Sequence, residues 1–339
     1  MKAAPARTLQ PVRYVDFDRP GDPSVLHVSE APAPVPRPGE VLIEVEAAGV
    51  GRADALQRQG NYPPPPSASK VLGLEVSGSI AQVGSGAKGL RVGDRVVALC
   101  NGGGYSEYVS VPAGQVLPLP PEWSFVDGAT LPENAFTVYD NVLVRARLRK
   151  DETLLVHGGT SGIGSMAIMF ALAIGAHPIA TAGSEKKCAA AIEIGAEYAI
   201  DYRTTDFVDR VLDYTGKRGV DVVLDIVGGD YLDRDLRVLA TDGRIACIAT
   251  AGGTQSTIDL RYLLQRRATI LGSSLRPRSD AEKAEIAAGL RARIWPLLGA
   301  RDPIVPVVDS VYPFSQAAQA HARLESSEHI GKIVLVPDA

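Results

Sequence analysis

The stretch Thr153–Gly164, TLLVHGGTSGIG, decides the fold of this 339-residue chain. A short apolar run ends in a glycine turn, and a helical pattern, SGIGSMAIMFALAIGA, follows it. Glycines at such a turn let the backbone approach a pyrophosphate, which the free N–H groups at the helix N-terminus can bind. Because the spacing differs from the standard G-x-G-x-x-G, a glycine turn without a ligand is the competing interpretation. The predicted cofactor contacts of this turn are Gly159, Thr160, Ser161, Gly162, Ile163 and Gly164.

Strand-like and helix-like segments alternate downstream of this turn. The apolar runs HPIATAG, YAIDY, VDVVLDIVG, GRIACIAT and ATILGSS are separated by helical segments. Strands alternating with helices of about 10–15 residues predict a parallel, doubly wound sheet, so the fold class is α/β. Right-handed crossovers would place helices on both faces of that sheet.

The N-terminal part has a different texture. Sixteen of the 24 prolines fall within residues 1–121, where short apolar runs alternate with turns, which predicts a β-rich domain. Near the C-terminus we expect a helix over about 280–298 and a last strand, GKIVLVPDA, that returns to the N-terminal domain. The predicted division is a β-rich catalytic domain over 1–131, a dinucleotide-binding domain over 132–272 and a return to the catalytic domain over 273–339.

The segment after the second predicted strand indicates which dinucleotide binds. An NAD site usually presents an acid about 20 residues after the glycine turn, to bind the ribose 2′-hydroxyl. Here Gly183 and Ser184 stand at that position, Lys187 follows within one helical turn, and Tyr202 ends the third strand beside Arg203. Hydrogen-bond donors and positive charge suit a 2′-phosphate, so we predict NADPH as the cofactor. We expect the nearby Glu185 to point to solvent.

Composition and charge argue against several other classes of protein. A formal net charge of -4 disfavours a nucleic-acid partner. No apolar run reaches the roughly 18 residues of a membrane span, and the N-terminus has no apolar signal core, so a cytoplasmic location is expected. The three cysteines lie far apart, which indicates neither a disulfide framework nor a structural zinc site.

A short-chain reductase is the first family to consider, because GGTSGIG also fits its G-x-x-x-G-x-G pattern. The motif begins at residue 158, however, and no Y-x-x-x-K follows it. We therefore reject that interpretation.

The chain resembles the zinc-independent NADPH:quinone oxidoreductase branch of the medium-chain dehydrogenase/reductase superfamily over nearly its whole length. The resemblance implies a GroES-like N-terminal domain, a Rossmann domain, a cofactor in the cleft between them and a homodimer. The stretches that resemble the branch are RADALQRQGNYPPPP, LGLEVSG, GGYSEYV, LPENAFTVYDNV, HGGTSGIG, TAGSEKK, RPRS and SSEHIGKIVL.

The resemblance also implies that no metal is bound. Zinc members of the superfamily have a cysteine where Gly51 stands and a histidine where Leu74 precedes Glu75. Neither glycine nor leucine has a side chain that can bind zinc, which needs three or four nitrogen, sulfur or oxygen ligands. Many quinone reductases have asparagine at the position of Gly51, so we expect either a roomier cleft or a water molecule there.

Tyr62 is the candidate catalytic residue, because a tyrosine follows the same motif in the family and lies near the nicotinamide. Packing of its ring against Pro63–Pro66 is an equally weighted alternative. Other residues that the resemblance implies near the cofactor are Thr137, Gly252, Ser274, Leu275 and Lys332. Plain structural roles compete with these assignments: Thr137 within a helix, Gly252 in a turn and Lys332 on the surface of an edge strand.

We predict an NADPH-dependent quinone reductase. Without a metal as Lewis acid, oxidation of an alcohol lacks its usual activation, whereas an electrophilic quinone or enone needs only hydride, a hydrogen-bond donor and a proton. One-electron reduction of the quinone stays open. Reduction of an enone or 2-alkenal at its double bond is the alternative, and a crystallin-like or RNA-binding role is less favoured.

Overall fold

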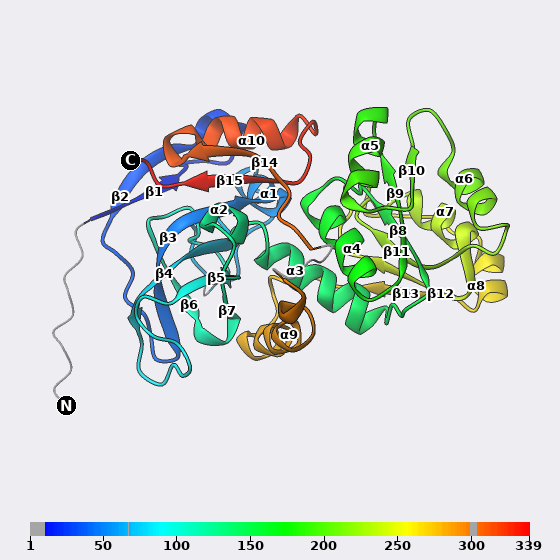
Figure 1. The fold of residues 1–339 in the computed structure, drawn as a ribbon. Helices are drawn as coiled ribbons and strands as arrows, with labels where there is room; N and C mark the ends of the chain where they lie inside the picture. The colour runs from blue at the N-terminus through cyan, green and yellow to red at the C-terminus, as the bar shows by residue number, and fades with distance from the viewer. Residues whose placement is uncertain (1–10, 67, 299–303) are drawn as a thin grey trace. The chain divides into compact units, whose positions relative to one another are not determined.

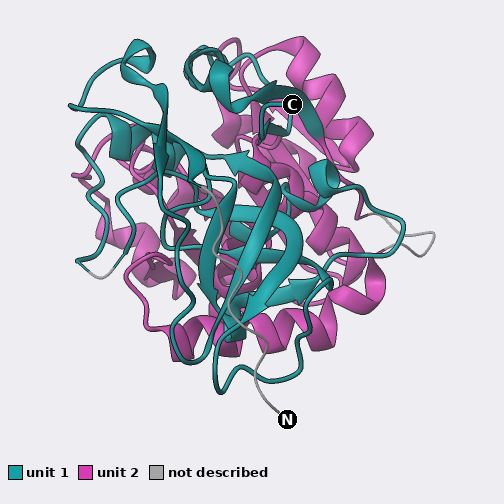
Figure 2. Cartoon of the chain, turned by 90° about the vertical axis from the view of Figure 1, so that its left-hand side faces the viewer, with its two compact units in different colours: residues 1–133, 308–339 teal, residues 134–307 magenta. Residues whose placement is uncertain are grey.

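The computed structural model describes residues 11–66, 68–298 and 304–339 (Figure 1). The chain forms two compact units, which Figure 2 shows in different colours. Unit 1 comprises residues 1–133 and 308–339, and unit 2 comprises residues 134–307. Among the described residues, no helix has both the length and the apolar character needed to cross a membrane.

Unit 1 is built on a seven-stranded sheet in the order β14-β15-β3-β4-β5-β7, with β6 also paired to β3. A separate antiparallel pair consists of β1 (Val12–Asp16) and β2 (His27–Ala31). The sheet strands are β3 (Glu40–Val50), β4 (Glu75–Val83), β5 (Arg95–Leu99), β6 (Tyr108–Pro112), β7 (Val116–Pro118), β14 (Val308–Pro313) and β15 (Lys332–Val336). The α-helices are α1 (Arg52–Arg58), α2 (Phe125–Gly128) and α10 (Ala317–Glu325). Single 3₁₀ turns are Pro23–Val25, Ala113–Gln115 and Phe314–Gln316.

The long strand β3 organises unit 1 because different parts of it pair with different neighbours. Its first half pairs with β6, from Glu40 to Glu44, and its end pairs with the closing strand β15, where Val50 lies opposite Ile333. Val41, Leu42 and Ile43 of β3 are all fully buried, so both faces of the strand are covered at this point. The C-terminal segment thus completes the sheet that the N-terminal segment began.

Unit 2 contains the predicted parallel sheet, and the expected α/β class is confirmed. Its six strands run in the order β10-β9-β8-β11-β12-β13, and every neighbouring pair is parallel. The strands are β8 (Thr153–His157), β9 (His177–Ala182), β10 (Tyr198–Asp201), β11 (Val220–Asp225), β12 (Leu239–Cys247) and β13 (Thr269–Gly272). The helices are α3 (Pro132–Val138, continued by a π-helix over Tyr139–Arg145), α4 (Gly162–Ala173), α5 (Glu185–Ile194), α6 (Phe207–Tyr214), α7 (Tyr231–Val238), α8 (Leu260–Arg266) and α9 (Asp280–Arg293).

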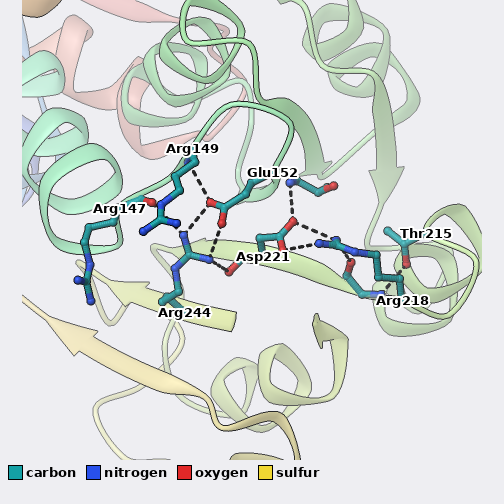
Figure 3. Close-up of polar contacts among 9 residues, drawn as sticks. Arg147, Arg149, Glu152, Thr215, Arg218, Asp221 and Arg244 are labelled. Carbon is teal, nitrogen blue, oxygen red and sulfur yellow. Dashed lines mark hydrogen bonds and ion pairs between the residues drawn. The ribbon is translucent and has the colours of Figure 1, made fainter. Parts of the chain in front are cut away.

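Polar contacts join the amino ends of the central strands of this sheet (Figure 3). Arg244 on β12 donates to Glu152, which precedes β8, and to the carbonyl of Arg147. Asp221 on β11 accepts from the backbone N–H of Thr153 at 2.8 Å and pairs with Arg218. These charged side chains bind one another at the amino edge of the sheet. Ligands of such sheets bind at the opposite, carboxyl edge, which is where we expect a site.

The chain leaves unit 2 later than we predicted. We expected the return at residue 273, whereas the compact unit extends to Val307. Two contacts explain the difference: Arg278 pairs with Asp140 at 2.6 Å, and Gly289 on α9 packs directly against the ring of Tyr139. The helix is also shorter than predicted, because α9 ends at Arg293 and a 3₁₀ turn containing Pro296 follows (Trp295–Leu297).

Candidate functional site

The carboxyl edge of the parallel sheet brings together most of the residues predicted to bind a cofactor. Starting from β8 at the centre of the sheet, β9 and β10 are added on one side, and β11, β12 and β13 are then added on the other side. The strand order therefore reverses between β8 and β11, and ligands of such sheets bind at this switch point, beyond the carboxyl ends of the strands. The residues that follow β8, β9, β10, β12 and β13 are, in turn, Gly159–Gly164, Gly183–Lys187, Tyr202, Gly252 and Ser274–Leu275.

The glycine turn after β8 leads directly into α4. Gly158 has a φ of +69°, which a residue with a side chain rarely adopts. Ser161 caps the helix, because its Oγ accepts from the N–H of Gly164 at 3.0 Å. The remaining N–H groups of the first turn of α4 are available to an anion, as at other dinucleotide sites.

Close packing explains the two other glycines of this turn. A Cβ on Gly159 would lie 2.5 Å from the Cβ of Ala180 on β9. A Cβ on Gly164 would lie 2.8 Å from the Cα of Gly159 and still closer to the carbonyl oxygen of Gly158. Helix α4 therefore approaches the strand end as closely as a backbone can, which is the arrangement a pyrophosphate cradle requires.

Beside this cradle, the loops after β9 and β10 meet. A Cβ on Gly183 would lie 2.8 Å from the hydroxyl of Tyr202 and 3.4 Å from Nε of Arg203. Ser184 caps α5 by accepting from the N–H of Lys187 at 3.3 Å. Tyr202 is 41% exposed, and Glu185 is exposed, as expected. Hydroxyl and guanidinium donors thus surround the position where an NAD site would have an acid.

Four further predicted contacts lie in unit 2, three of them in loops and one on a helix. Gly252 follows β12, is exposed and donates its N–H to the carbonyl of Val227 at 2.7 Å. Ser274 and Leu275 follow β13, with Ser274 exposed. Thr137 is half-buried on α3, where its carbonyl accepts from Asn141. Their contact with a cofactor stays a prediction.

A buried polar group supports the cradle from below. His157, the last residue of β8, is fully buried, and its Nε2 lies 2.8 Å from Oδ1 of Asp235. Its Nδ1 lies 3.0 Å from Oγ1 of Thr181, whose carbonyl accepts from the N–H of Gly159 at 2.9 Å. The rings of Phe207 and Tyr231 pack edge-on against the imidazole. The orientation of the glycine turn therefore depends on a fully hydrogen-bonded histidine beneath it.

Unit 1 contains a cluster of buried charges, which we name the acidic cluster: Asp54, Glu75, Glu133 and Lys332. The Nζ of Lys332 lies 2.5 Å from Glu75 and 3.3 Å from Glu133. Glu75 also accepts from the N–H of Glu133 at 2.8 Å. Asp54 accepts from the N–H groups of Gly51 and Gly73, both at 2.9 Å. Lys332, a predicted cofactor contact, is therefore buried and ion-paired, which excludes the alternative of a surface lysine; its contact with a cofactor stays a prediction.

Burial and like charge shift the pKa values of this cluster. Burial, aided by the charge of Glu133, raises the pKa of Asp54 to about 6 and that of Glu75 to about 7. Burial alone would lower the pKa of Lys332, but Glu75 and Glu133 outweigh it and hold that pKa above its usual value. Three carboxylates share one ammonium, so the cluster gains negative charge as the pH rises through 6 and 7.

A carboxylate oxygen of Glu133 lies beside Gly51. A Cβ on Gly51 would lie 2.5 Å from Oε2 of Glu133 and 3.5 Å from Oδ2 of Asp54. We expected either a roomier cleft or a water molecule at this position, and both stay predictions. The carboxylate of Glu133 takes the place of the missing side chain.

Tyr62 lies in the loop after α1 and is half-buried, directly before the proline run. Its role as a hydrogen-bond donor to a substrate stays a prediction. Within the part of the chain that the structure describes, no group of three or more histidine, cysteine, aspartate or glutamate side chains is arranged to hold a metal ion.

Sequence reasoning missed the role of Glu133 and did not commit to Arg203. Glu133 occurs inside LPENAFTVYDNV, and Arg203 directly follows Tyr202, but neither position has a distinctive spacing. Only the folded chain shows that Glu133 reaches the space beside Gly51 and that Arg203 reaches Gly183.

Comparisons with known proteins match this architecture. Residues 37–121 match the family model described as alcohol dehydrogenase GroES-like domain, and residues 162–288 match the one described as zinc-binding dehydrogenase. The quinone oxidoreductase of Rattus norvegicus is 31% identical over 97% of this chain and 98% of its own length. The crystal structure of Escherichia coli quinone oxidoreductase complexed with NADPH is 30% identical, has a TM-score of 0.79, and matches over 96% of this chain and 100% of that chain. The crystal structure of CurK enoyl reductase is 25% identical, has a TM-score of 0.83, and matches over 97% and 100%.

Proposed function

We propose that this chain, which belongs to the quinone oxidoreductase branch of the medium-chain dehydrogenase/reductase superfamily, transfers hydride from NADPH to a quinone. One observation carries the proposal. The glycine cradle lies at the switch point of the sheet, and beside it Gly183, Tyr202 and Arg203 come together at the ends of β9 and β10. The cradle suits a pyrophosphate, and the corner suits a 2′-phosphate. Relatives that are named quinone oxidoreductases over their full length support the choice of acceptor.

The residues of unit 2 fit NADPH in a testable way. Gly159 and Gly164 leave no room for a Cβ, so the backbone itself forms the wall of the cradle. Ser184 and Lys187 at the start of α5, together with Tyr202, would bind the 2′-phosphate. Thr137, Gly252, Ser274 and Leu275 of unit 2 are proposed further contacts of the cofactor, as is Lys332 of unit 1. NADPH supplies the hydride when it is bound, and these residues hold and orient it.

Unit 1 would receive the acceptor. We propose that Tyr62 donates a hydrogen bond to the acceptor oxygen that gains electron density, which assists hydride transfer to an already electrophilic substrate. We also propose that the reaction is zinc-independent. Gly51 and Leu74 occupy the two positions where zinc members have cysteine and histidine, and the carboxylate of Glu133 fills the space beside Gly51.

The test is the steady-state oxidation of NADPH with a panel of quinones and enones. We expect turnover of quinones, a preference for NADPH over NADH, and no loss of activity after treatment with a chelator. Tyr62→Phe should leave the affinity for NADPH nearly unchanged and lower turnover. A preference for NADH would contradict the cofactor assignment, and unchanged turnover of Tyr62→Phe on every acceptor would remove the donor role.

Reduction of an enone at its double bond is the second candidate. The similarity to CurK enoyl reductase favours it, because that structure matches this chain over 97% of its length and its name refers to the reduction of a double bond. The same panel separates the candidates: turnover of enones with inert quinones would select the second. Trapping of one-electron products with a radical-sensitive dye would show whether quinones are reduced in one-electron steps.

We also propose a homodimer formed through β13. This strand is last in the sheet order, so its outer edge has unpaired backbone groups. Its side chains are mostly exposed, with Ile270 37% exposed, and Leu264 on the adjacent α8 is 74% exposed. Light scattering should give about twice 35.8 kDa for the wild type. Ile270→Lys should reduce this mass to that of one chain, whereas Val92→Lys, at an exposed position of unit 1, should not. A monomeric wild type would contradict the proposal.

A cytoplasmic location and the absence of a nucleic-acid partner stay predictions. The three cysteines, Cys100, Cys188 and Cys247, are all free, which accords with a reducing compartment. Fractionation of cells that express the chain, and binding assays with RNA at varied salt, would test these two predictions separately.

A further inference from the structure

We infer that Glu133 is a specificity-determining residue, whose carboxylate stands in the place of a residue-51 side chain and selects against negatively charged acceptors. The inference rests on the proposed function, because it concerns the substrate class of the same site.

The backbone at position 51 does not require glycine. Gly51 has a φ of -122° and a ψ of 166°, an extended conformation that any residue adopts. A Cβ there would lie 2.5 Å from Oε2 of Glu133, so a side chain at position 51 would require this carboxylate to move. The next nearest atoms are Cδ of Glu133 at 3.4 Å and Oδ2 of Asp54 at 3.5 Å. The glycine at position 51 therefore leaves room for the carboxylate of Glu133 in its present position.

One contact positions the backbone of Glu133, and a second positions its carboxylate. Its backbone N–H donates to Oε2 of Glu75 at 2.8 Å, which fixes the start of α3. Its Oε2 lies 3.3 Å from Nζ of Lys332. An acceptor that approaches Gly51 would therefore meet a positioned oxygen atom and not a freely moving side chain.

Glu133 is also the acid of the acidic cluster that an outside molecule can reach. Its side chain is 18% exposed, whereas the side chain of Glu75 is fully buried and Asp54 is 1% exposed. Lys332, at 5% exposure, lies closer to Glu75 than to Glu133. The ammonium therefore compensates chiefly Glu75, and the accessible face of the cluster keeps a negative charge.

Charge at this position would discriminate between acceptors of similar shape. A sulfonated or carboxylated quinone would bring a like charge toward Glu133, and like charges a few ångströms apart near a protein surface repel appreciably. A neutral quinone of the same ring size avoids this repulsion. Such a repulsive element is a common means of specificity, since it penalises the wrong partner without strengthening the right one.

The test compares kcat/KM for a neutral acceptor, 2-methyl-1,4-naphthoquinone, with that for 1,4-naphthoquinone-2-sulfonate, both at saturating NADPH. The wild type should favour the neutral quinone, and Glu133→Gln should raise the sulfonate-to-neutral ratio by roughly tenfold. Glu122→Gln is the matched control, because it removes the same charge from an exposed position in the same unit and should leave the ratio unchanged. Circular dichroism and urea unfolding check that each variant is folded.

The wild type alone provides a second measurement. Its discrimination against the sulfonate should weaken as salt rises from low ionic strength, because salt screens an accessible charge. An unchanged ratio in Glu133→Gln, or wild-type discrimination that does not depend on salt, would overturn the inference. A chain that turns over neither quinone would instead contradict the proposed function.

Discussion

At the scale of single residues, Arg203 offers the sharpest test of cofactor choice. Its Nε lies 3.4 Å from where a Cβ of Gly183 would be, in the corner that replaces the acid of an NAD site. Hydrogen bonds to a charged group contribute about 1.5–3 kcal/mol, so Arg203→Ala should raise the Kd of NADPH by roughly tenfold or more. The Kd of NADH should change little, because NADH lacks the 2′-phosphate.

The matched control for that experiment is Arg210→Ala. Arg210 is also an exposed arginine of unit 2, but it lies on α6 and donates to the hydroxyl of Tyr198. It should leave both Kd values unchanged in fluorescence titrations. Equal weakening of NADPH and NADH by Arg203→Ala would show that the residue supports the fold and does not contact the 2′-phosphate.

Lys332 is the residue on which the acidic cluster depends. Removal of one partner from a buried ion pair costs about 3–5 kcal/mol, because the remaining charge is left without compensation. Lys332→Met should therefore lower the free energy of unfolding by about this amount at pH 8. The defect should be smaller at pH 5, because Glu75 and Asp54 can then take up protons.

Urea unfolding of Lys332→Met and of the double variant Glu75→Met/Lys332→Met measures this effect. The double variant removes both charges of the closest pair, so it should be more stable than Lys332→Met alone. If Lys332→Met is as stable as the wild type at pH 8, Lys332 does not neutralise the cluster.

At the scale of elements, the approach of α4 to β8 depends on Gly164. Its Cβ would collide with the carbonyl of Gly158, and backbone atoms cannot move aside cheaply. Gly164→Ala should weaken NADPH binding strongly and lower stability by about 1–3 kcal/mol, as other overpacked sites do. Gly272→Ala on β13 is the control, since nothing lies within 4 Å of its Cβ. Equal NADPH affinity in the two variants would contradict the cradle.

Elements were the easiest level to predict from the sequence, for a physical reason. In unit 2, the hydrophobic pattern and the glycine turn are local features of the sequence. Strands such as β8 and β11, and the parallel direction of the strands, could therefore be predicted from neighbouring residues. The end of unit 2 could not, because it depends on contacts between segments far apart in the sequence, namely Arg278 with Asp140 and Gly289 with Tyr139. Residue pairs such as Gly51 and Glu133 were beyond reach, because their contact exists only after the strands have paired.

At the scale of the whole molecule, the two units should respond differently to pH. In unit 1 the raised pKa values of Asp54 and Glu75 mean that the folded chain binds more protons than the unfolded chain between about pH 4 and 7. Stability contributed by these two groups is therefore present at low pH and is lost as pH rises through 6 and 7. Unit 2 has a fully buried contact between Nε2 of His157 and Oδ1 of Asp235, where burial raises the pKa of Asp235 despite the histidine.

Each unit has one tryptophan, Trp123 in unit 1 and Trp295 in unit 2, which makes this difference measurable. In a Trp295→Phe background, fluorescence reports unit 1 through Trp123, which is 7% exposed. The free energy of unfolding of unit 1 in urea should fall from pH 5 to pH 8. Lys332→Met should make the fall steeper, because the ammonium is what favours ionised Glu75 at the higher pH. A free energy that rises over this range would contradict the raised pKa values of Asp54 and Glu75.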